Sequence, residues 1–485
     1  MKQILCILLS VLGWTTGMTQ NPYQIKGKVD CENKGIHGVV VSDGKNCVQT
    51  DEQGNYSLDI DNESQFVFIS TPAGYLTEIK ENTIPLFYEP IDRSSDKEYD
   101  FHLKKNPHDD LNHVFFAQAD VQAISSENLD TYHTFQNDYL EQLAAYPNTD
   151  IFGIDCGDIT GDNAQLFPPY IEAVKTLNIP IYRAIGNHDM DYNGRSFETS
   201  HHSFESYFGP TCYSFNKGKM HYIVINNNFY IGREFYYIGY IDEKTFQWIE
   251  KDLSFLEKGS PLVIVMHIPT RLTEKQQPFQ FDYNTLADQT VNAEAFHQLI
   301  QDHPTHIISG HMHYNLNICY NDRLMEHNTA AICGTWWCSD ICLDGTPRGY
   351  GIYQVNGNQL TWKYKCIGKP DNYQARVYLP GASQEYPQAI IANVWNWDEQ
   401  WKVEWMEDGK VMGEMTQFTA FDPLAEKICN KAVQTYSWIA PVKTNHLFKA
   451  IPKNPQAQIS VKITDRFGHE YLQPAEDFSS TLLIK

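Results

Sequence analysis

Apolar runs in the middle of this chain repeatedly end in side chains of the types that can bind metal ions, and this feature constrains the fold more than any other. Residues 113–119 lead to Asp120 and Gln122, and residues 151–156 lead to Asp158. Runs of this length that alternate with helical patterns predict a layered α/β domain. In open α/β sheets, ligands bind at the carboxyl edge of the strands. We therefore expect these side chains to gather at one edge.

Three further apolar runs end in the same way. The residues that follow them are Asn187, His267, His311 and His313. Carboxylates neutralise divalent charge, imidazoles suit Zn, Fe and Mn, and Asn offers a neutral oxygen. Glycines at 157, 186 and 310 allow the backbone to turn sharply beside an ion. The set suffices for two ions about 3.5–4 Å apart, which can clamp an in-line displacement at phosphorus.

The order of these motifs resembles that of the calcineurin-like metallophosphoesterases, in particular an exported bacterial subgroup with additional β-domains. The motifs are Gly157-Asp158, the GNHD stretch at 186–189, His267 and the GHMH stretch at 310–313. The resemblance implies an α/β fold, namely a four-layer α/β/β/α sandwich flanked by two small all-β domains of the β-sandwich type. It also implies a phosphoric ester hydrolase, either a phosphatase or a phosphodiesterase.

The resemblance also implies a role for each residue of the motifs. The first ion takes Asp120, Asp158 and His313 with Gln122 nearby, and the second takes Asp158, Asn187, His267 and His311. Asp158 bridges the two ions, which are Mn, Zn, Fe or Ni, and a water or hydroxide between them attacks phosphorus. His188 faces the substrate and protonates the leaving oxygen, and Asp189 holds the His188 ring in the right tautomer.

Two positions depart from related patterns. The family usually begins with Asp-x-His, whereas this chain has Gln122, which either binds the first ion through its amide oxygen or is a bystander. Purple acid phosphatases place a tyrosine three residues after the bridging Asp, and Gly161 occupies that position here. A tyrosinate–iron(III) pair is therefore not expected.

A second group of residues offers contacts for a substrate. Its members are Arg195 and His202, which follow the GNHD stretch, and Trp336, Trp337, Asp344 and Arg348, which follow the GHMH stretch. Arg binds phosphate through two parallel hydrogen bonds, and paired Trp rings suit a sugar or alcohol leaving group. The alternative is that the His residues lie in solvated loops and that the Trp-rich segment is structural.

Composition changes along the chain predict three domains after a leader. Residues 1–20 read as a secretory signal peptide, so we expect an exported protein, periplasmic or extracellular. Residues 21–105 form a β-module of the carboxypeptidase-regulatory or immunoglobulin-like kind, residues 106–368 the α/β domain, and residues 369–485 a second β-sandwich. No later apolar stretch is long enough to span a membrane.

Tryptophan and cysteine patterns add two smaller expectations. Trp395, Trp397, Trp401 and Trp405 occupy odd positions, so they form either the core of the last domain or a sugar-stacking platform. Cysteines 333, 338 and 342 are close enough in sequence to suggest one local disulfide.

The net charge of the chain limits the kinds of partner that it can bind. The formal charge of −23 disfavours nucleic acid, which needs a basic surface, and therefore disfavours a nuclease. We expect a small-molecule, glycan-linked or lipid-linked phosphoester, as a monoester or a diester. The alternative is a non-catalytic protein that binds glycans or a surface and has a degenerate metal centre.

Overall fold

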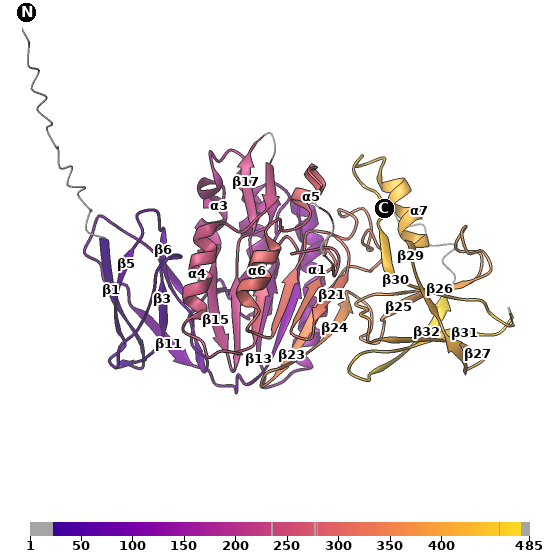
Figure 1. Cartoon of the computed structure of the whole chain (residues 1–485), viewed down its shortest axis with the longest axis horizontal. Coiled ribbons are helices and arrows are strands. Elements are labelled where there is room, and N and C mark those ends of the chain that lie inside the picture. The colour runs from indigo at the N-terminus through magenta and orange to yellow at the C-terminus, as the bar shows by residue number, and fades with distance from the viewer. Residues whose placement is uncertain (1–22, 234–235, 276–277, 279, 455, 477–485) are drawn as a thin grey trace, which may run out of the picture.

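The computed structural model describes residues 23–233, 236–275, 278, 280–454 and 456–476, so the expected signal peptide lies outside the described residues. Three units follow one another along the long axis (Figure 1): a β-rich unit, a central α/β unit and a second β-rich unit with one helix. None of the helices in the described ranges is long and apolar enough to cross a membrane.

The N-terminal unit consists of two main sheets. Strand β5 (Asn55–Ile60) alternates exposed and buried residues, so Tyr56, Leu58 and Ile60 face the core. One sheet contains β1 (Tyr23–Cys31), β2 (Lys34–Gly35), β5 (Asn55–Ile60), β7 (Tyr75–Leu76) and β11 (Phe101–Lys105). The other contains β3 (Val40–Ser42), β4 (Cys47–Gln49), β6 (Phe66–Ile69) and β10 (Tyr88–Pro90), and a small ladder joins β8 (Ile79–Lys80) to β9 (Ile84–Pro85).

Two sheets form the centre of the α/β unit. The first has the order β14-β13-β12-β23-β24, with β12 (Asn112–Gln118), β13 (Asp150–Asp155), β14 (Ile181–Arg183), β23 (Gly349–Asn356) and β24 (Gln359–Cys366). The second has the order β15-β16-β19-β20-β22-β21, with β15 (Tyr213–Lys217), β16 (Met220–Val224), β19 (Leu262–Val265), β20 (Thr305–Ser309), β21 (Leu316–Asn321) and β22 (Leu324–Asn328). Strand β19 is buried along its whole length, as expected where both faces of a parallel sheet are covered.

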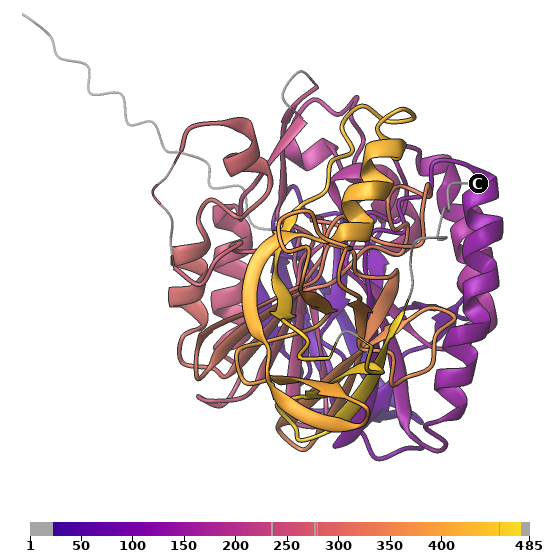
Figure 2. The same ribbon diagram turned by 90° about the vertical axis from the view of Figure 1, so that its right-hand side faces the viewer.

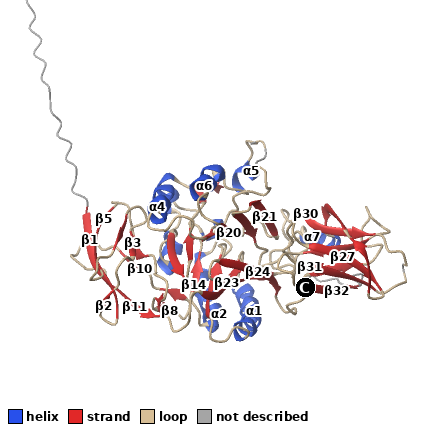
Figure 3. Ribbon diagram, turned by 60° about the horizontal axis from the view of Figure 1, so that its bottom comes forward, coloured by secondary structure: helices blue, strands red, loops and turns tan. Residues whose placement is uncertain are grey.

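Helices cover the outer faces of both sheets (Figure 3). Helices α1 (Ser126–Ala144) and α2 (Phe167–Val174) lie on one side, and α4 (Glu243–Leu253) and α6 (Ala293–Ile300) lie on the other. Ser125 and Asp242 cap the first turns of α1 and α4. The order of layers is therefore α/β/β/α, as predicted. Smaller elements of this unit are α3 (His202–Phe208), α5 (Tyr283–Ala287), β17 (Asn228–Gly232), β18 (Tyr236–Gly239), η1 (Ala164–Leu166), η2 (Lys175–Leu177), η3 (Asn187–Asp189) and η4 (Phe197–Thr199).

Aromatic rings fill the space between the two sheets. Phe115 stacks on Tyr353 at 4.7 Å and meets Tyr222 of the second sheet edge-on at 5.6 Å. Phe152 also meets Tyr222 edge-on, at 5.3 Å. Such pairs add about 0.5–1.5 kcal/mol beyond the burial of their area, so this layer fixes the two sheets against each other.

The strands of the C-terminal unit are joined by hydrogen bonds into one sheet, and the unit lies in front of the two central sheets in Figure 2. Its eight strands follow one continuous order, β28-β27-β31-β32-β25-β26-β30-β29, rather than two separate ladders. The strands are β25 (Ala375–Tyr378), β26 (Ile390–Val394), β27 (Lys402–Glu407), β28 (Lys410–Glu414), β29 (Thr416–Phe421), β30 (Lys443–Ala450), β31 (Ile459–Thr464) and β32 (Glu470–Glu476), and α7 is Pro423–Ala432.

Tryptophans of this unit are core residues. Trp395, Trp401 and Trp405 are buried, and Trp397 packs against the same apolar cluster as Trp401 and Trp405. The structure therefore favours the core interpretation over a sugar platform. All ten described cysteines are free, so the expected local disulfide near Cys333 is wrong.

Both flanking units cover the edge strands of the central sheets. On the N-terminal side, the Ile181 N–H of β14 donates to the Thr83 carbonyl at 2.8 Å, and Thr71 pairs with Phe215 of β15. Unpaired strand edges are prone to association, and these contacts close them.

The C-terminal unit closes the two opposite edges. Phe467 meets Trp362 of β24 edge-on at 4.9 Å. The Asn317 amide of β21 donates to the Asn396 carbonyl at 2.8 Å. The central sheets are thus covered on both faces by helices or by each other, and at both edges by the flanking units.

Candidate active site

All predicted metal ligands lie in turns directly after central strands. Strands β12, β13 and β14 are neighbours in the first sheet and lead to Asp120, Asp158 and Asn187. Strands β19 and β20 are neighbours in the second sheet and lead to His267 and to the GHMH turn. The carboxyl edges of the two sheets therefore converge on one site, as the strand pattern predicts.

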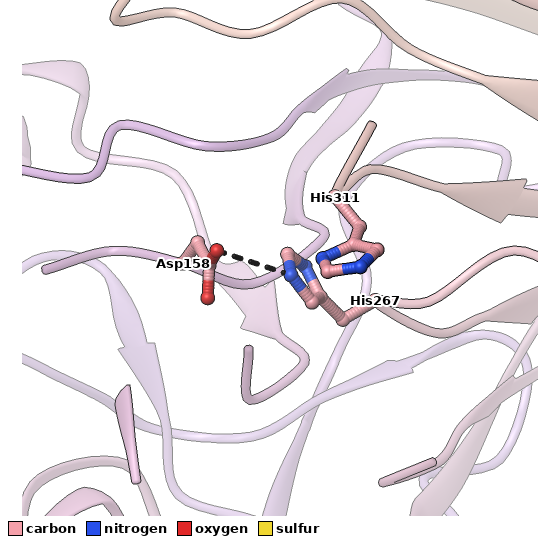
Figure 4. A group of neighbouring side chains, drawn as sticks. All are labelled: Asp158, His267 and His311. Carbon is pink, nitrogen blue, oxygen red and sulfur yellow. Dashed lines mark ion pairs between the residues drawn. The ribbon is translucent and has the colours of Figure 1, made fainter. Parts of the chain in front are cut away.

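The tightest cluster contains four of the predicted ligands. His267 Nε2 lies 3.0 Å from Asn187 Oδ1 and 3.2 Å from Asp158 Oδ2. The ligand atoms of Asp158, His267 and His311 all lie within 4.8 Å of one another (Figure 4). These are the residues that the family resemblance assigns to the second ion.

The orientation of the His267 ring suits metal binding. Its Nδ1 donates to the Cys156 carbonyl at 2.8 Å, because a carbonyl can only accept. This bond orients the ring so that Nε2 faces Asp158 and Asn187, where it could bind an ion after losing its proton. Burial lowers the pKa of His267, but the Asp158 carboxylate outweighs burial and raises the pKa to about 9. The side chain is fully buried, so Nε2 has no access to bulk water.

A second pair lies beside this cluster. His313 Nε2 is 3.6 Å from Asp120 Oδ1. Both Asp120 oxygens accept from the His311 N–H, at 3.1 and 3.0 Å. The same turn therefore supplies His313 as a neighbour of Asp120 and a backbone donor that orients this carboxylate.

Backbone strain is concentrated at these positions. Five non-glycine residues of the site have a positive φ: Asp120 at 56°, Gln122 at 39°, Asp158 at 53°, His311 at 72° and His313 at 55°. The left-handed conformation costs a non-glycine residue about 1–3 kcal/mol and clusters at functional sites. The strain points to a site whose side-chain directions matter.

Glycine permits the closest approach between two of these turns. A Cβ at Gly186 would lie 2.1 Å from both the backbone nitrogen and Oδ1 of Asp158. Gly157 has a φ of +96°, and a Cβ there would lie 2.7 Å from the Gly186 nitrogen. Both glycines are therefore required for Asp158 to reach its observed position.

The donor set fits divalent cations. The Asp120 and Asp158 carboxylates are both buried. Within the described residues, their ion pairs are with histidine side chains and not with lysine or arginine. Burial raises the pKa of Asp120 to about 8, and the neighbouring Asp158 carboxylate also raises it. A nearby cation would compensate both effects, and two carboxylates, imidazoles and an amide oxygen are the ligands that Zn, Mn and Fe accept.

Gln122 lies in the site but its contacts are with protein groups. Its side chain is buried, and the Cys333 thiol lies 3.9 Å from its Oε1. The same sulfur lies 3.6 Å from His313 Nδ1. Cys333 is a neighbour of the site that sequence analysis considered only as a disulfide partner. Its position just before the Trp-rich segment offered no signal of this contact.

His188 has a carboxylate partner that differs from the predicted one. Its Nδ1 lies 2.7 Å from Asp162 Oδ1, and its backbone N–H donates to Asp158 Oδ1 at 2.8 Å. Burial lowers the pKa of His188, but the carboxylates of Asp158 and Asp162 outweigh it and raise the pKa to about 9. These carboxylates favour the protonated ring, and about one third of its side chain is exposed.

Asp189 instead holds the backbone of two turns together, which corrects the prediction that it orients the His188 ring. Its carboxylate accepts from the N–H groups of Ile159, Thr160 and Gly186 at 2.9–3.1 Å. Asp189 is buried and its oxygens accept these backbone groups, while the His188 ring pairs with Asp162 instead.

The two tryptophans after the GHMH turn contact the site from behind. Trp336 stacks on His313 with 4.3 Å between ring centroids. The Trp337 indole N–H donates to the Val121 carbonyl at 3.1 Å, and its ring stacks on Phe135. Trp336 is half-buried and fixes the His313 ring, and Trp337 supports the turn that carries Gln122.

Two other predicted substrate contacts are buried among protein groups. Asp344 is fully buried and accepts from the Asn315 and Thr346 N–H groups. The Arg348 guanidinium donates to the Ser339 carbonyl and lies over the Trp337 ring. Their burial corrects the prediction that they contact substrate.

The residues after the GNHD stretch face outward. Arg195 is exposed in the loop before η4, and His202 is exposed at the start of α3. His201 is half-buried, and its Nε2 lies 3.7 Å from the Glu205 carboxylate. Contact of Arg195 and His202 with a substrate stays a prediction.

Two converging sheet edges, a buried set of carboxylate and imidazole ligands, and a histidine with a raised pKa beside it define a metal-dependent hydrolase. Comparison with known families specifies the class. Residues 100–315 match the model of the calcineurin-like phosphoesterases, residues 23–106 match its N-terminal companion, and residues 326–471 match its C-terminal companion. The chain belongs to the calcineurin-like phosphoesterases, and it is a metal-dependent phosphoric ester hydrolase.

Solved structures of low sequence identity also match the chain. A dimetal phosphatase from Danio rerio is 13% identical, with 53% of this chain and 97% of that chain covered and a TM-score of 0.38. A purple acid phosphatase from yellow lupin (Lupinus luteus) is 13% identical, with 70% and 68% covered and a TM-score of 0.40. No protein of curated function matches the sequence.

Proposed function

We propose that the protein is exported and hydrolyses a phosphoester with two metal ions and with His188 as the general acid. The observation that carries this proposal is the convergence of seven predicted ligands from two sheets on one buried site. Asp158, Asn187, His267 and His311 would hold one ion, and Asp120, Asp158 and His313 the other, with Gln122 as a candidate ligand. Bound ions polarise the phosphoryl group and lower the pKa of water near neutrality.

The residues of the chain supply proton transfer and orientation. His188 Nδ1 donates to Asp162, which leaves the protonated Nε2 free to donate to the leaving oxygen. Asp162 is a positioning residue in this scheme, because it touches the ring and not the substrate. The Asp158 carboxylate accepts the His188 N–H, so the acid and the metal ligands are held in one frame.

The substrate that we propose is a small-molecule, glycan-linked or lipid-linked phosphoester. The net charge of −23 supports a substrate that the metal centre attracts locally over a nucleic acid that needs an extended basic surface. The half-buried Trp336 beside His313 offers an aromatic wall next to the site.

Paired assays test the proposal. The purified protein is stripped of metal, then given Mn, Zn, Fe or Ni, and assayed with p-nitrophenyl phosphate and bis-p-nitrophenyl phosphate. We expect metal-dependent turnover that Asp158→Asn abolishes together with most metal binding, and the ratio of the two rates separates monoesterase from diesterase. Two bound ions without turnover of either ester would contradict the proposal and support a non-catalytic binding protein.

A further inference from the structure

A buried loop connects the metal-ligand turn with the C-terminal unit. On the side of the site, the Leu343 N–H donates to the His313 carbonyl at 3.2 Å, and the Asn315 N–H donates to Asp344 Oδ2 at 3.0 Å. The Thr346 hydroxyl also donates to Asp344 Oδ2, at 2.7 Å. The loop 343–347 therefore holds the backbone of the turn at His313 and two residues beyond it.

Three strands of the C-terminal unit hold the other side of this loop. His446 of β30 places Nε2 3.0 Å from Asp344 Oδ2. Asn393 of β26 donates to the Asp344 carbonyl at 2.8 Å, and Arg376 of β25 donates to the Gly345 carbonyl at 2.6 Å. His446, Asn393 and Arg376 are at most 5% exposed. The contact between the loop 343–347 and the C-terminal unit is therefore buried and not exposed to solvent.

Both ring nitrogens of His446 have buried polar partners. The Asn393 amide nitrogen donates to Asp344 O and to Asp422 Oδ2, so its oxygen faces His446 Nδ1, at 2.7 Å, as an acceptor. The other ring nitrogen faces a carboxylate, which also accepts. Both ring nitrogens therefore face acceptor oxygens, and the ring links Asn393 to the Asp344 carboxylate. Removing the ring leaves this buried carboxylate without one of its partners.

We propose that His446 is a positioning residue for the metal centre, acting through Asp344 on the turn that carries His313. The inference rests on the proposed function, because it takes His313 to hold a metal ion. His313 has a left-handed φ of 55°, and such a residue stays in place only where surrounding contacts hold it. The loop 343–347 supplies such contacts and the C-terminal unit holds the loop, so this unit completes the metal centre instead of serving as a separate module.

The test compares two buried positions of the C-terminal unit in the full chain. His446→Gln breaks the buried contact with the loop 343–347. Glu407→Gln is the matched control, because Glu407 is buried and accepts from the Lys453 and Asn454 N–H groups within its own unit. Calorimetry measures Mn²⁺ binding to both variants and to the wild type, and thermal unfolding is recorded in chelator.

We expect His446→Gln to weaken one of the two Mn²⁺ sites at least tenfold, the effect of losing a residue that orients a ligand, and to leave the other within twofold. Glu407→Gln should bind Mn²⁺ as the wild type does. Unchanged Mn²⁺ binding by folded His446→Gln, or an equal loss in both variants, would overturn the inference. A wild type that binds no Mn²⁺ would instead refute the proposed function itself.

A second variant keeps the test valid if His446→Gln does not fold. Asn393→Ala retains both His446 and Asp344 but removes the amide that holds them in register. We expect the same selective loss of one Mn²⁺ site, by threefold or more. Wild-type affinity at both sites in Asn393→Ala would overturn the inference.

Discussion

Single residues at the metal site are held against their own backbone preference. Asp120, Asp158, His311 and His313 are all left-handed, and each is tied to a neighbouring turn by the bonds described above. Strained positions of this kind persist because several contacts of the surrounding structure hold each of them in place. The effect of a substitution at one of these residues therefore depends on whether its side chain is proposed to bind a metal ion, to transfer a proton or to support the backbone.

His188→Ala tests the proton-transfer role. Its ring contacts Asp162, and no metal ligation is assigned to it, so we expect kcat to fall by about 10²–10⁴ while metal content stays near that of the wild type. Steady-state kinetics and metal analysis of the same preparation provide the check. Loss of one bound ion in this variant would show that His188 is a ligand.

Asp162→Asn and Asp189→Asn test which carboxylate serves His188. About half of the Asp162 side chain is exposed, so its loss should lower kcat about tenfold with little change in the unfolding midpoint. Asp189 is buried and accepts three backbone N–H groups, so its replacement should lower the unfolding midpoint by several degrees. The reverse assignment of these two effects would contradict the observed pairing.

Turns between elements decide whether the ligands can meet. The turn at 186–189 passes so close to Asp158 that only glycine fits at its first position. The same turn forms η3, which begins with the predicted ligand Asn187 and ends with Asp189. Local sequence thus encodes the turn. The turn matters for the site because it brings together residues that follow two different strands of the chain.

Gly186→Ala should therefore weaken metal binding sharply. The added Cβ would lie 2.1 Å from Asp158 N and Oδ1, so the ligand must move. Gly357→Ala is a control, because a Cβ there meets nothing within 4 Å and only its positive φ is strained. We expect the control to cost about 1 kcal/mol of stability and to bind metal normally. Wild-type metal affinity in Gly186→Ala would show that the turn has room to relax.

The whole molecule is arranged so that both pairs of sheet edges are covered. The N-terminal unit closes β14 and β15, and the C-terminal unit closes β24 and β21. The match to the C-terminal family model begins at residue 326 and so includes β23 and β24 of the first central sheet. The flanking units are therefore parts of one framework.

A buried histidine in this framework predicts acid sensitivity. His113 donates from Nδ1 to the Asp110 carbonyl and accepts the Tyr222 hydroxyl at Nε2, and burial lowers its pKa to about 4. Because the unfolded pKa is 6.5, the stabilisation is complete above that pH and is lost as the pH falls toward 4. The loss is about 2 kcal/mol between pH 7.5 and pH 5. His113→Gln should show a smaller drop in unfolding midpoint over this range, and an equal drop would contradict the assignment.

Much of the fold and of the candidate site follows from the sequence. Apolar strands, the helical faces and the turns that end in Asp158, Asn187 and His267 are local patterns, so a layered α/β domain and the candidate ligands are predictable from them. The four-layer order followed from the family resemblance. The local disulfide near Cys333 and the substrate contacts at Asp344 and Arg348 were wrong. Proximity in sequence does not tell which side chains are buried or what they meet.

Residue types and spacing alone predicted a layered α/β domain with metal-binding side chains gathered at one sheet edge, in a motif order that resembles the calcineurin-like phosphoesterases. Only the tertiary structure decided that Asp162 and not Asp189 meets His188, across 26 residues. It also decided that His446 meets Asp344 across 102 residues. The physical reason is that ligand chemistry and strand periodicity are properties of short segments. The partner of a buried charge depends on which distant segments pack together.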